Sequence, residues 1–533
     1  MALIGKWEIM NKKRVIRIIL SIVVFYFILM LLLFAVEAIP KDSPSSIDSL
    51  GDAAWYLLAT LTTVGYGDVT PVSFAGKVIG AIMMISSAGV LTFLLGLVFT
   101  VLFGRLLPTF TLWRYRKKDW YVFSSVDERS QLLAEGLSKD DPDAAYIFCG
   151  SEENLSQKHY PVMKYHVITD TPIEVVMKKQ DPAGKCFLFL VTEKKWDNYN
   201  IGSNILNKMN RDNLEVYCEA DHAPDHMSHA FSVFNKPDCI ARKYWNDNPL
   251  NAGESGIILI GDGTIAQKLL ERGLLINVFP PEQTIEYHVF GDWENFRFDH
   301  YELENIVGIN GLLFDDDGIF FENKPWNASA GLLRAASRII ICADDEDKNR
   351  SVVEELKAFF PTKARIDVYS DGNDESFGSF GGDTGIFTRE IVMHEKLNRV
   401  ARMLNEIYRT KTGSGPSWNE LTEFKRQSNI AAADHMLTKI RLLKPMDDIR
   451  EVTPETCSMA YEVYKSFNES QKDACRWLEH KRWMRFHVLN NWSYGAVRDN
   501  DMRQHTMIVP YEDLSKEEQL IDDMAWELLG EIT

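Results

Sequence analysis

Two long runs without a charged residue lie near the start of this 533-residue chain, at Ile18–Val36 and Val78–Gly104. A helix of about 20 apolar residues crosses the hydrocarbon layer of a membrane. A basic segment, 12–17, precedes the first run as in a secretory signal, but the run is too long for a signal and no small-residue cleavage site follows it. The sequence therefore predicts two membrane-spanning helices, at about 15–38 and about 76–104.

Positive charge is concentrated on one side of the two predicted spans. Basic residues lie before the first span and, at 105–118, directly after the second. Cytoplasmic loops of membrane proteins carry an excess of Lys and Arg. We therefore expect a multi-pass protein of the cell membrane, with both termini in the cytoplasm and the loop Ala38–Phe74 outside.

Acidic residues outnumber basic ones in the rest of the chain, and the formal net charge is −18 at pH 7. A protein that must neutralise phosphates usually carries net positive charge, so nucleic acid is not an expected partner. The 7 cysteines show neither CxxC pairing nor metal-ligand spacing. They are expected to be reduced core residues of a cytosolic region.

Short apolar runs alternate with amphipathic segments after Lys118, and this pattern starts afresh at Gly256–Gly261. Such alternation is typical of parallel sheets covered by helices, so it predicts two tandem Rossmann-like α/β domains. A Gly/Ser/Pro linker follows at Thr412–Pro416, and the sequence beyond it is typical of a mainly α-helical domain. The predicted divisions are a helical membrane domain at 1–117, Rossmann-like domains at 118–250 and 251–411, and a C-terminal domain at 412–533.

The turn after the first strand of a Rossmann domain binds pyrophosphate when it reads Gly-x-Gly-x-x-Gly or ends in Ala. In the first domain this turn is Ser124–Arg129, whose acidic residues would repel phosphate, so we expect a structural role. The second domain has the permitted form at Gly261–Ala266. Gly261 and Gly263 are therefore candidates for binding an adenine nucleotide, with Asp292 as a candidate for its ribose hydroxyl, although Asp292 lies farther along the chain than is usual.

The external loop contains a segment, 55–68, that holds two glycines in close succession. Its central residues are Thr63, Val64, Gly65, Tyr66 and Gly67. The segment resembles the pore signature of potassium channels, in which backbone carbonyls replace the hydration shell of the ion. Glycines supply backbone angles that are closed to other residues. The resemblance implies a pore helix and selectivity filter at 50–68, with potassium ions bound at Thr63, Val64, Gly65 and Tyr66.

A single chain cannot enclose such a filter, so the resemblance implies a homotetramer with closed symmetry. Gly89 lies where the pore-lining helix of the family bends, which makes it a candidate gate hinge. Close packing of small residues against a neighbouring helix explains this glycine equally well. The spans carry no repeat of arginines, so no voltage sensor is expected.

Tandem Rossmann-like domains behind such a pore resemble the conductance-regulating RCK domains of prokaryotic potassium channels. The resemblance implies a cytoplasmic ring that pulls on the inner helices, and a nucleotide or calcium bound in these domains is one alternative for gating. The acidic runs Asp315–Asp317 and Asp344–Asp347 lack the ligand pattern of a calcium loop and are interpreted as solvated turns. A membrane-anchored, NAD-dependent oxidoreductase is an alternative from another functional class.

The segment that begins at Cys475 resembles the RyR domain, a cytosolic repeat named after ryanodine receptors, with Asn491 replacing the usual glycine. Its aromatic residues offer stacking surfaces and its basic residues offer donors for phosphate, a combination that suits a nucleotide. The alternative is that the same aromatic residues form the domain core. The candidate ligand residues are Arg482, Trp483, Trp492, Tyr494, Arg498 and His505.

These patterns together predict a potassium-selective channel, not an enzyme, that is gated by a small cytoplasmic ligand. The hypothesis for that ligand is a cyclic dinucleotide, cyclic di-AMP, bound at the RyR domain. Bacteria couple this messenger to potassium balance, so the hypothesis depends on the biology of the class and not on particular residues.

Overall fold

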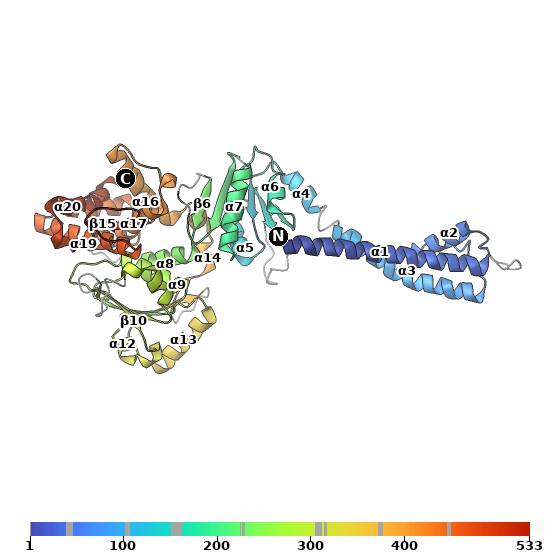
Figure 1. Ribbon diagram of the computed structural model, residues 1–533, viewed down its shortest axis with the longest axis horizontal. Helices are drawn as coiled ribbons and strands as arrows, with labels where there is room; N and C mark the ends of the chain where they lie inside the picture. Colours follow the sequence, from blue (N-terminus) through green and yellow to red (C-terminus); the bar gives the residue numbers. More distant parts are fainter. Residues whose placement is uncertain are drawn as a thin grey trace. The chain divides into compact units, whose positions relative to one another are not determined.

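Figure 1 shows the computed structural model of the chain, in which a helical N-terminal unit precedes a larger unit of sheets and helices. The two units are Met1–Trp113 and Arg114–Thr533. The structure describes residues 2–38, 46–101, 107–150, 163–209, 211–223, 225, 230–303, 312–313, 317–370, 377–444 and 449–532.

Three helices form most of the described part of the first unit. They are α1 (Ala2–Glu37), α2 (Leu50–Leu61) and α3 (Phe74–Val101). Ile16–Glu37 and Phe74–Gly96 are long and apolar enough to cross a membrane, and only 22% and 17% of their most apolar windows is buried. Such exposure distinguishes them from the core helices of a soluble protein, which supports the two predicted spans. Residues 102–104 of the second predicted span lie outside the described residues.

Glu37 joins the end of α1 to the start of α3. Its side chain is fully buried, at 0% exposure. The carboxylate accepts hydrogen bonds from the backbone N–H groups of Val72 (3.1 Å) and Ser73 (3.0 Å) and from the Ser73 hydroxyl (2.6 Å). A negative charge is favourable at a helix N-terminus because the N–H groups there lack partners within the helix. The sequence analysis did not predict this contact, since Glu37 resembles any acidic residue that follows a membrane span.

The first sheet of the second unit is entirely parallel, with the order β3-β2-β1-β4-β5-β6. This is the Rossmann order, so the first predicted α/β domain is confirmed. Its strands are β1 (Trp120–Phe123), β2 (Ala145–Cys149), β3 (His166–Thr169), β4 (Cys186–Leu190), β5 (Leu214–Glu219) and β6 (Phe231–Phe234). The helices around it are α5 (Glu128–Asp140), α6 (Ile173–Met177), α7 (Lys195–Met209) and α8 (Lys236–Asp247), while α4 (Leu107–Tyr115) precedes β1 at the division between the two units.

The second sheet has the order β13-β12-β11-β7-β8-β10-β9, and only the β9–β10 pair is antiparallel. The same Rossmann order is present, which confirms the second α/β domain. Its strands are β7 (Gly256–Ile260), β8 (Glu286–Phe290), β9 (Leu312–Leu313), β10 (Asp317–Glu322), β11 (Arg338–Ile341), β12 (Arg365–Ser370) and β13 (Gly378–Gly381). The helices are α9 (Thr264–Ile276), α10 (Glu294–Asp299), α12 (Ala330–Ala335), α13 (Glu346–Phe359), α14 (Asp383–Ile386) and α15 (Arg389–Val392).

The C-terminal part is mainly α-helical, as the sequence predicted. Its long helices are α16 (Arg399–Thr412), α17 (Glu423–Leu443), α18 (Pro454–Lys465) and α19 (Glu469–Leu489). Two short strands, β14 (Ser493–Tyr494) and β15 (Gln504–His505), form a parallel pair after α19. The chain ends with α20 (Lys516–Ile521) and α21 (Met524–Glu527).

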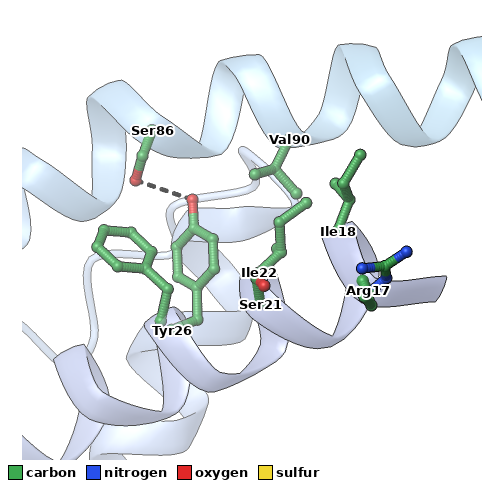
Figure 2. Close-up of a pocket in the computed structure, with 8 residues that line it drawn as sticks. Arg17, Ile18, Ser21, Ile22, Tyr26, Ser86 and Val90 are labelled. Carbon is green, nitrogen blue, oxygen red and sulfur yellow. Dashed lines mark hydrogen bonds between the residues drawn. The ribbon is translucent and has the colours of Figure 1, made fainter. Parts of the chain in front are cut away.

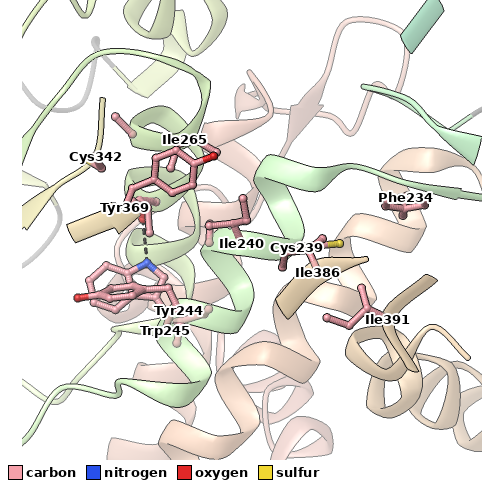
Figure 3. Close-up of a cluster of buried hydrophobic side chains, with 14 of the residues drawn as sticks. Phe234, Cys239, Ile240, Tyr244, Trp245, Ile265, Cys342, Tyr369, Ile386 and Ile391 are labelled. Atoms are coloured by element: carbon pink, nitrogen blue, oxygen red, sulfur yellow. Dashed lines mark hydrogen bonds between the residues drawn. The ribbon is translucent and has the colours of Figure 1, made fainter. Parts of the chain in front are cut away.

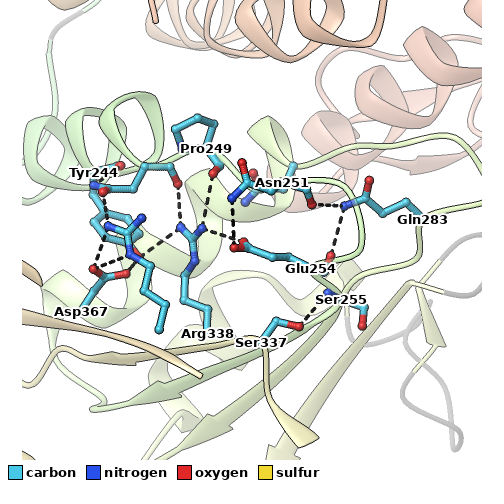
Figure 4. A network of polar contacts seen from close by, with 12 residues as sticks. Tyr244, Pro249, Asn251, Glu254, Ser255, Gln283, Ser337, Arg338 and Asp367 are labelled. Carbon is cyan, nitrogen blue, oxygen red and sulfur yellow. Dashed lines mark hydrogen bonds and ion pairs between the residues drawn. The ribbon is translucent and has the colours of Figure 1, made fainter. Parts of the chain in front are cut away.

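The predicted junction between the Rossmann-like domains is anchored by Arg338 of β11 (Figure 4). The guanidinium of Arg338 is fully buried and donates to the carbonyl of Asn248 (2.6 Å) and to the carboxylate of Glu254 (2.6 Å). Beside it, the hydroxyl of Tyr244 donates to Asp367 of β12 (2.8 Å). Because buried charges require such partners, the junction is a fixed part of the second domain and not a flexible linker.

A single hydrophobic cluster runs through both Rossmann-like domains and into the C-terminal part. It includes Phe123 of β1, Leu259 of β7 and Phe486 of α19. Figure 3 shows the region around α8, where Ile240 and Trp245 pack against residues of the second domain. Because the C-terminal part shares this core, it is not a freely tethered module.

Side chains of the C-terminal part also cap the end of α9. Arg485 donates to the carbonyl of Leu274 (3.1 Å) and Thr438 donates to the carbonyl of Ile276 (2.9 Å). His435 is hydrogen-bonded to the carbonyl of Val278 at 3.0 Å, and burial lowers the pKa of this imidazole to about 3. The last carbonyls of a helix have no partner within it, so these contacts stabilise α9 from outside.

Candidate functional site

The filter loop is held against the end of α2 by backbone hydrogen bonds. The N–H groups of Val64 (3.0 Å) and Gly65 (3.1 Å) both donate to the carbonyl of Ala59. The N–H of Thr63 donates to the carbonyl of Thr60 at 3.1 Å. These bonds fix where the loop leaves the pore helix.

Positive φ recurs at every second residue of the loop. Thr63, Gly65 and Gly67 have φ values of 57°, 57° and 74°, whereas Val64 and Tyr66 have negative φ. This alternation turns successive peptide groups the same way, so their carbonyls can line one side of the chain. Left-handed backbone angles cost little free energy at glycine but are strained at threonine. The backbone of Thr63, the first residue of the candidate filter, is therefore strained.

Aromatic packing supports the filter on the side away from the carbonyls. The rings of Trp55 and Tyr66 stack with centroids 5.6 Å apart and planes 8° apart. The indole N–H of Trp55 donates to the carboxylate of Asp68 at 3.0 Å. Trp55 therefore ties α2 to the middle and the outer end of the candidate filter loop.

Gly89 lies within the unbroken helix α3. A Cβ atom built on Gly89 meets no other atom within 4 Å. Packing within the described part of one chain therefore does not require glycine at this position. Two explanations for a glycine at this position remain, namely a bend in α3 and close contact with another copy of the chain.

In the first Rossmann-like domain, an acidic side chain caps the helix that follows β1. Asp127 precedes α5, and its carboxylate accepts from the N–H of Ser130 (2.8 Å) and from the hydroxyl of Ser125 (2.7 Å). A bound phosphate uses these same N–H groups in a dinucleotide-binding domain. The contacts are those of the structural turn that the sequence predicted.

In the second domain, Asp344 occupies the N-terminus of α9. Its carboxylate accepts from the N–H groups of Thr264 (3.0 Å) and Ile265 (3.0 Å) and from the Thr264 hydroxyl (3.1 Å). A Cβ on Gly263 would lie 2.4 Å from this carboxylate. The group that fills the phosphate position is therefore part of the chain itself.

The other two nucleotide candidates lie around the same turn. Gly261 has φ +145°, and a Cβ there would lie 2.7 Å from the carbonyl carbon of Cys342. The N–H of Asp292 donates to the carboxylate of Asp262 at 2.9 Å. Asp344 follows β11, which pairs with β7 at the point where the strand order of the sheet reverses. The Rossmann strand order is therefore the signal from which the position of Asp344 could have been predicted.

Aromatic and histidine side chains of α19 and the loop after it form one cluster. The ring of Trp483 lies 3.9 Å from that of His487 and 5.0 Å from that of His505, between centroids. Trp492 stacks on Phe424 of α17 at 5.2 Å. The structure thus brings together three of the candidate ligand residues, and it adds Phe424, which the sequence did not single out.

Most of this cluster is buried. Trp492 is 5% exposed and His505 is 8% exposed. Burial lowers the pKa of His487 to about 3 and also lowers the pKa of His505. Both imidazoles are therefore neutral at physiological pH, and His505 offers a ligand a hydrogen-bonding ring without a positive charge.

Arg482 points into the domain interior and is only 3% exposed. Its guanidinium donates to the carboxylate of Glu479 through Nε (3.1 Å) and Nη2 (2.6 Å), and Lys439 pairs with the same carboxylate at 2.6 Å. Burial opposes ionisation of Glu479, but the charges of Arg482 and Lys439 outweigh it and lower the pKa. Arg482 therefore contributes to an internal ion cluster, and a ligand phosphate would have to displace Glu479 to reach it.

Tyr494 and Arg498 are the exposed members of the candidate set. Tyr494 is 57% exposed and pairs with His505 between β14 and β15. The guanidinium of Arg498 is exposed and donates to Asn500 at 3.1 Å. The β14–β15 face, formed by Tyr494 and Arg498 with His505 and Trp483 behind them, is therefore the accessible part of the predicted site.

Two family models match the chain. Residues 18–104 match the ion channel family, and residues 464–530 match the RyR domain. The first match covers both spans and the filter, and the second covers α19 and the β14–β15 face. The two resemblances are confirmed for these segments, so the chain carries an ion-channel domain and an RyR domain.

Several curated relatives are similar to a short stretch of the chain. The voltage-gated potassium channel of Aeropyrum pernix is 47% identical over 66 residues, which is 12% of this chain and 22% of that channel. The calcium-gated potassium channel TvoK of Thermoplasma volcanium is 29% identical over 118 residues, 22% of this chain and 34% of that channel. A human voltage-gated potassium channel, subfamily A member 4, is 40% identical over 76 residues, 14% of this chain and 11% of the relative. The matched stretch thus spans between 11% and 34% of each of these relatives.

Among solved structures, the chain is similar to the GsuK channel. The ADP-bound structure is 14% identical with a TM-score of 0.34, covering 70% of this chain and 99% of GsuK. The NAD-bound structure is 11% identical with a TM-score of 0.33, covering 72% and 85%. TM-scores at this level are too low to define a shared fold, and the Rossmann assignment depends on strand order and register instead.

Proposed function

We propose that four copies of this chain form a potassium-selective channel whose filter is Thr63–Gly67. The observation that carries the proposal is the alternation of φ through this loop, inside a segment that matches the ion channel family. In a tetramer the carbonyls of the first four filter residues would face the pore axis and replace the water around each potassium ion. Since Trp55 and Asp68 brace the loop from behind, the carbonyls would be held at a fixed distance from the ion.

The proposed channel lies in the cell membrane as a homotetramer, with both termini of each chain in the cytoplasm. The basic residues that flank the two apolar helices support this orientation. Gly89 is the proposed hinge of the gate, because no contact among the described residues of one chain explains glycine there. The Rossmann-like domains and the RyR domain would then form the cytoplasmic region that acts on α3.

Two observations argue against the alternative that the chain is an NAD-dependent oxidoreductase. Asp344 fills the position at the N-terminus of α9 that the pyrophosphate of a dinucleotide would need. The curated relatives that match the chain are named as potassium channels and not as enzymes. The second Rossmann-like domain is therefore better explained as a regulatory part of a channel.

The proposed gating ligand is a cyclic dinucleotide, such as cyclic di-AMP, at the β14–β15 face. Tyr494 offers an exposed ring for stacking on a base, and Arg498 offers donors for a phosphate. The turns of both Rossmann-like domains are already capped by carboxylates, which disfavours a phosphate there. Because α17 and α19 cap α9, a ligand that binds one arrangement of the RyR domain more tightly would also bias the second Rossmann-like domain.

Calorimetry on the purified full-length tetramer tests this ligand. We expect heat of binding with cyclic di-AMP that is lost in Arg498→Ala and kept in Lys465→Ala, which removes an exposed positive charge from α18 of the same domain. The full chain is needed because the RyR domain shares its core with the second Rossmann-like domain. No heat with any cyclic dinucleotide would exclude this class of ligand, and heat with ADP or NAD alone would move the regulatory site to the second Rossmann-like domain.

A further inference from the structure

Helix α4 (Leu107–Tyr115) keeps a stripe of apolar side chains exposed. Leu107, Phe110 and Trp113 are 46%, 58% and 56% exposed, and the rings of Phe110 and Trp113 stack with centroids 5.9 Å apart. Residues three apart are neighbours on one face of a helix, so these side chains form one stripe. Leu112 is fully buried, and it lies about half a turn from Phe110, so α4 buries its opposite face.

The two long apolar helices that precede α4 in the chain cover each other in part (Figure 2). The hydroxyl of Tyr26 in α1 donates to Ser86 of α3 at 2.8 Å, and Ile22 and Val90 line a groove of about 490 Å³ beside this contact. The stripe of α4 is still about half exposed in the described part of the chain. Exposed apolar surface of this kind is typically covered by another protein or by a membrane.

Positive charge accompanies the stripe. Arg114 lies four positions after Phe110, on the same face of α4, and Lys117 follows the helix. Both are exposed, and neither has a hydrogen bond or ion pair with another residue that the structure describes. Residues 1–17 and 102–118, which flank the spans on the predicted cytoplasmic side, hold five basic residues each and only one acidic residue, Glu8. Glu8 can therefore balance only a small part of this charge.

The place of α4 in the sequence keeps it close to the membrane. The uncharged run Val78–Gly104 ends three residues before Leu107. An extended residue spans at most about 3.6 Å, so α4 begins within about 11 Å of the end of that run, whatever path the chain takes. The headgroup layer of a bilayer lies at a similar distance from the hydrocarbon, and aromatic residues are enriched there.

We propose that α4 is an interfacial helix that binds the cytoplasmic surface of an anionic bilayer. Its apolar stripe enters the boundary between headgroups and acyl chains, and Arg114 and Lys117 pair with lipid phosphates. A bilayer offers apolar surface and negative charge together, whereas the same flanking segments of a second copy would add positive charge. The proposal depends on the proposed function only in taking α1 and α3 as membrane spans, and it requires no ion conduction.

Fluorescence quenching of the full-length protein in lipid nanodiscs tests the proposal. All 7 cysteines are buried, so Phe110→Cys supplies an exposed thiol that a small fluorophore labels selectively. In phosphatidylglycerol nanodiscs, a nitroxide carried by the lipid should quench this label and dissolved iodide should not. Phe359→Cys is the matched control, because it replaces a phenylalanine of α13 that is 73% exposed, and it should show the reverse.

The contribution of charge is measured on the same labelled protein. One basic residue near an anionic surface changes binding by about fivefold. The double variant Arg114→Gln with Lys117→Gln should therefore lower the ratio of lipid-bound to water-exposed label in phosphatidylglycerol by about thirtyfold. Phosphatidylcholine nanodiscs should lower this ratio for the wild-type pair as well, and Glu8→Gln should leave the preference for phosphatidylglycerol unchanged.

Several results would overturn the proposal. A label at position 110 that iodide alone quenches lies in water, and a label that neither agent quenches is covered by protein. Equal quenching by the lipid nitroxide in the two kinds of nanodisc would show that Arg114 and Lys117 do not pair with lipid phosphates. A preference for phosphatidylglycerol that appears only in Glu8→Gln would show that Glu8 holds these cations. An absence of potassium efflux would contradict the proposed channel and leave all of these results unaffected.

Discussion

At the scale of single residues, Trp55 is the side chain on which the filter geometry depends most. Trp55→Phe keeps an aromatic ring to stack on Tyr66 but removes the hydrogen bond to Asp68. A hydrogen bond to a charged group contributes about 1.5–3 kcal/mol, so the outer end of the filter should loosen. We expect reduced discrimination of potassium from sodium in liposome flux. Trp113→Phe, outside the filter, is the control, and equal selectivity in both variants would contradict this role.

Asp522 gives the RyR domain a defined dependence on pH. Burial, and then the nearby charge of Glu479, raise its pKa from 3.8 to about 8. Between these values the folded protein keeps a proton that the unfolded chain has lost, so this group makes stability fall as pH rises. The neutral amide of Asp522→Asn should remove this fall and make the variant more stable than wild type above about pH 8.

Thermal unfolding of the full chain at about pH 6 and about pH 9 checks this sign. Asp523→Asn is the matched control, because it breaks the 2.7 Å ion pair with Arg476 and should lower the melting temperature at both pH values. A difference between Asp522→Asn and wild type that does not change with pH would show that Asp522 ionises normally.

The residue scale also shows where sequence reasoning succeeds and where it stops. The left-handed backbone angles of the candidate filter loop were predictable because they are local, and Gly65 and Gly67 supply them directly. The role of Asp344 was not predicted, because it depends on a contact with Thr264, 80 positions away in the sequence. The acidic run Asp344–Asp347 was interpreted as a solvated turn, but Asp344 caps the N-terminus of α9.

At the scale of elements, α3 carries the proposed hinge. Gly89→Ala meets no steric obstacle within the chain and should stabilise the straight helix by up to about 1 kcal/mol. If opening requires a bend at Gly89, the variant should favour the closed state. Open probability in planar bilayers measures this, with Gly96→Ala as a control in the same helix. Identical gating of the two variants would remove Gly89 from the gate.

Helix α19 joins the RyR domain to the second Rossmann-like domain through Asp317. This carboxylate is 2% exposed, lies 3.0 Å from Lys481 and pairs closely with Arg485. Asp317→Leu would leave two buried cations without their partner and should cost about 3–5 kcal/mol of unfolding free energy. Asp513→Asn, at an exposed site in the same part of the chain, should change it little. Equal melting temperatures would contradict a role for this cluster.

The sequence could not predict the burial of α19. Periodicity identifies a helix with one apolar face, but α19 is largely buried from Cys475 onward, and Lys481, Arg482 and Arg485 are each 3% exposed or less. Their partners come from distant segments, so Arg482 was interpreted as a ligand residue when it pairs with Glu479. The Rossmann sheets, by contrast, were predictable because buried parallel strands appear as short apolar runs.

At the scale of the whole molecule, the unit Arg114–Thr533 is one folded body with a shared core, and the proposed filter belongs to a separate unit. In the proposed channel, the part that selects the ion is therefore distinct from the part that would bind a ligand. Ligand binding can alter conduction only by favouring one arrangement of the cytoplasmic unit over another. Ion selectivity is the property that the filter alone should determine.

Ion efflux from liposomes that contain the purified tetramer tests the central claim most directly. Potassium-loaded vesicles should release their ion and sodium-loaded vesicles should retain theirs, with cyclic di-AMP present or absent to cover both gate states. Gly65→Ala should abolish the potassium flux, because alanine is strained at a φ of +57°. Potassium efflux that exceeds sodium efflux and disappears in the variant is the result that this account predicts. Equal release of the two ions, or no potassium efflux under any ligand condition, would contradict it.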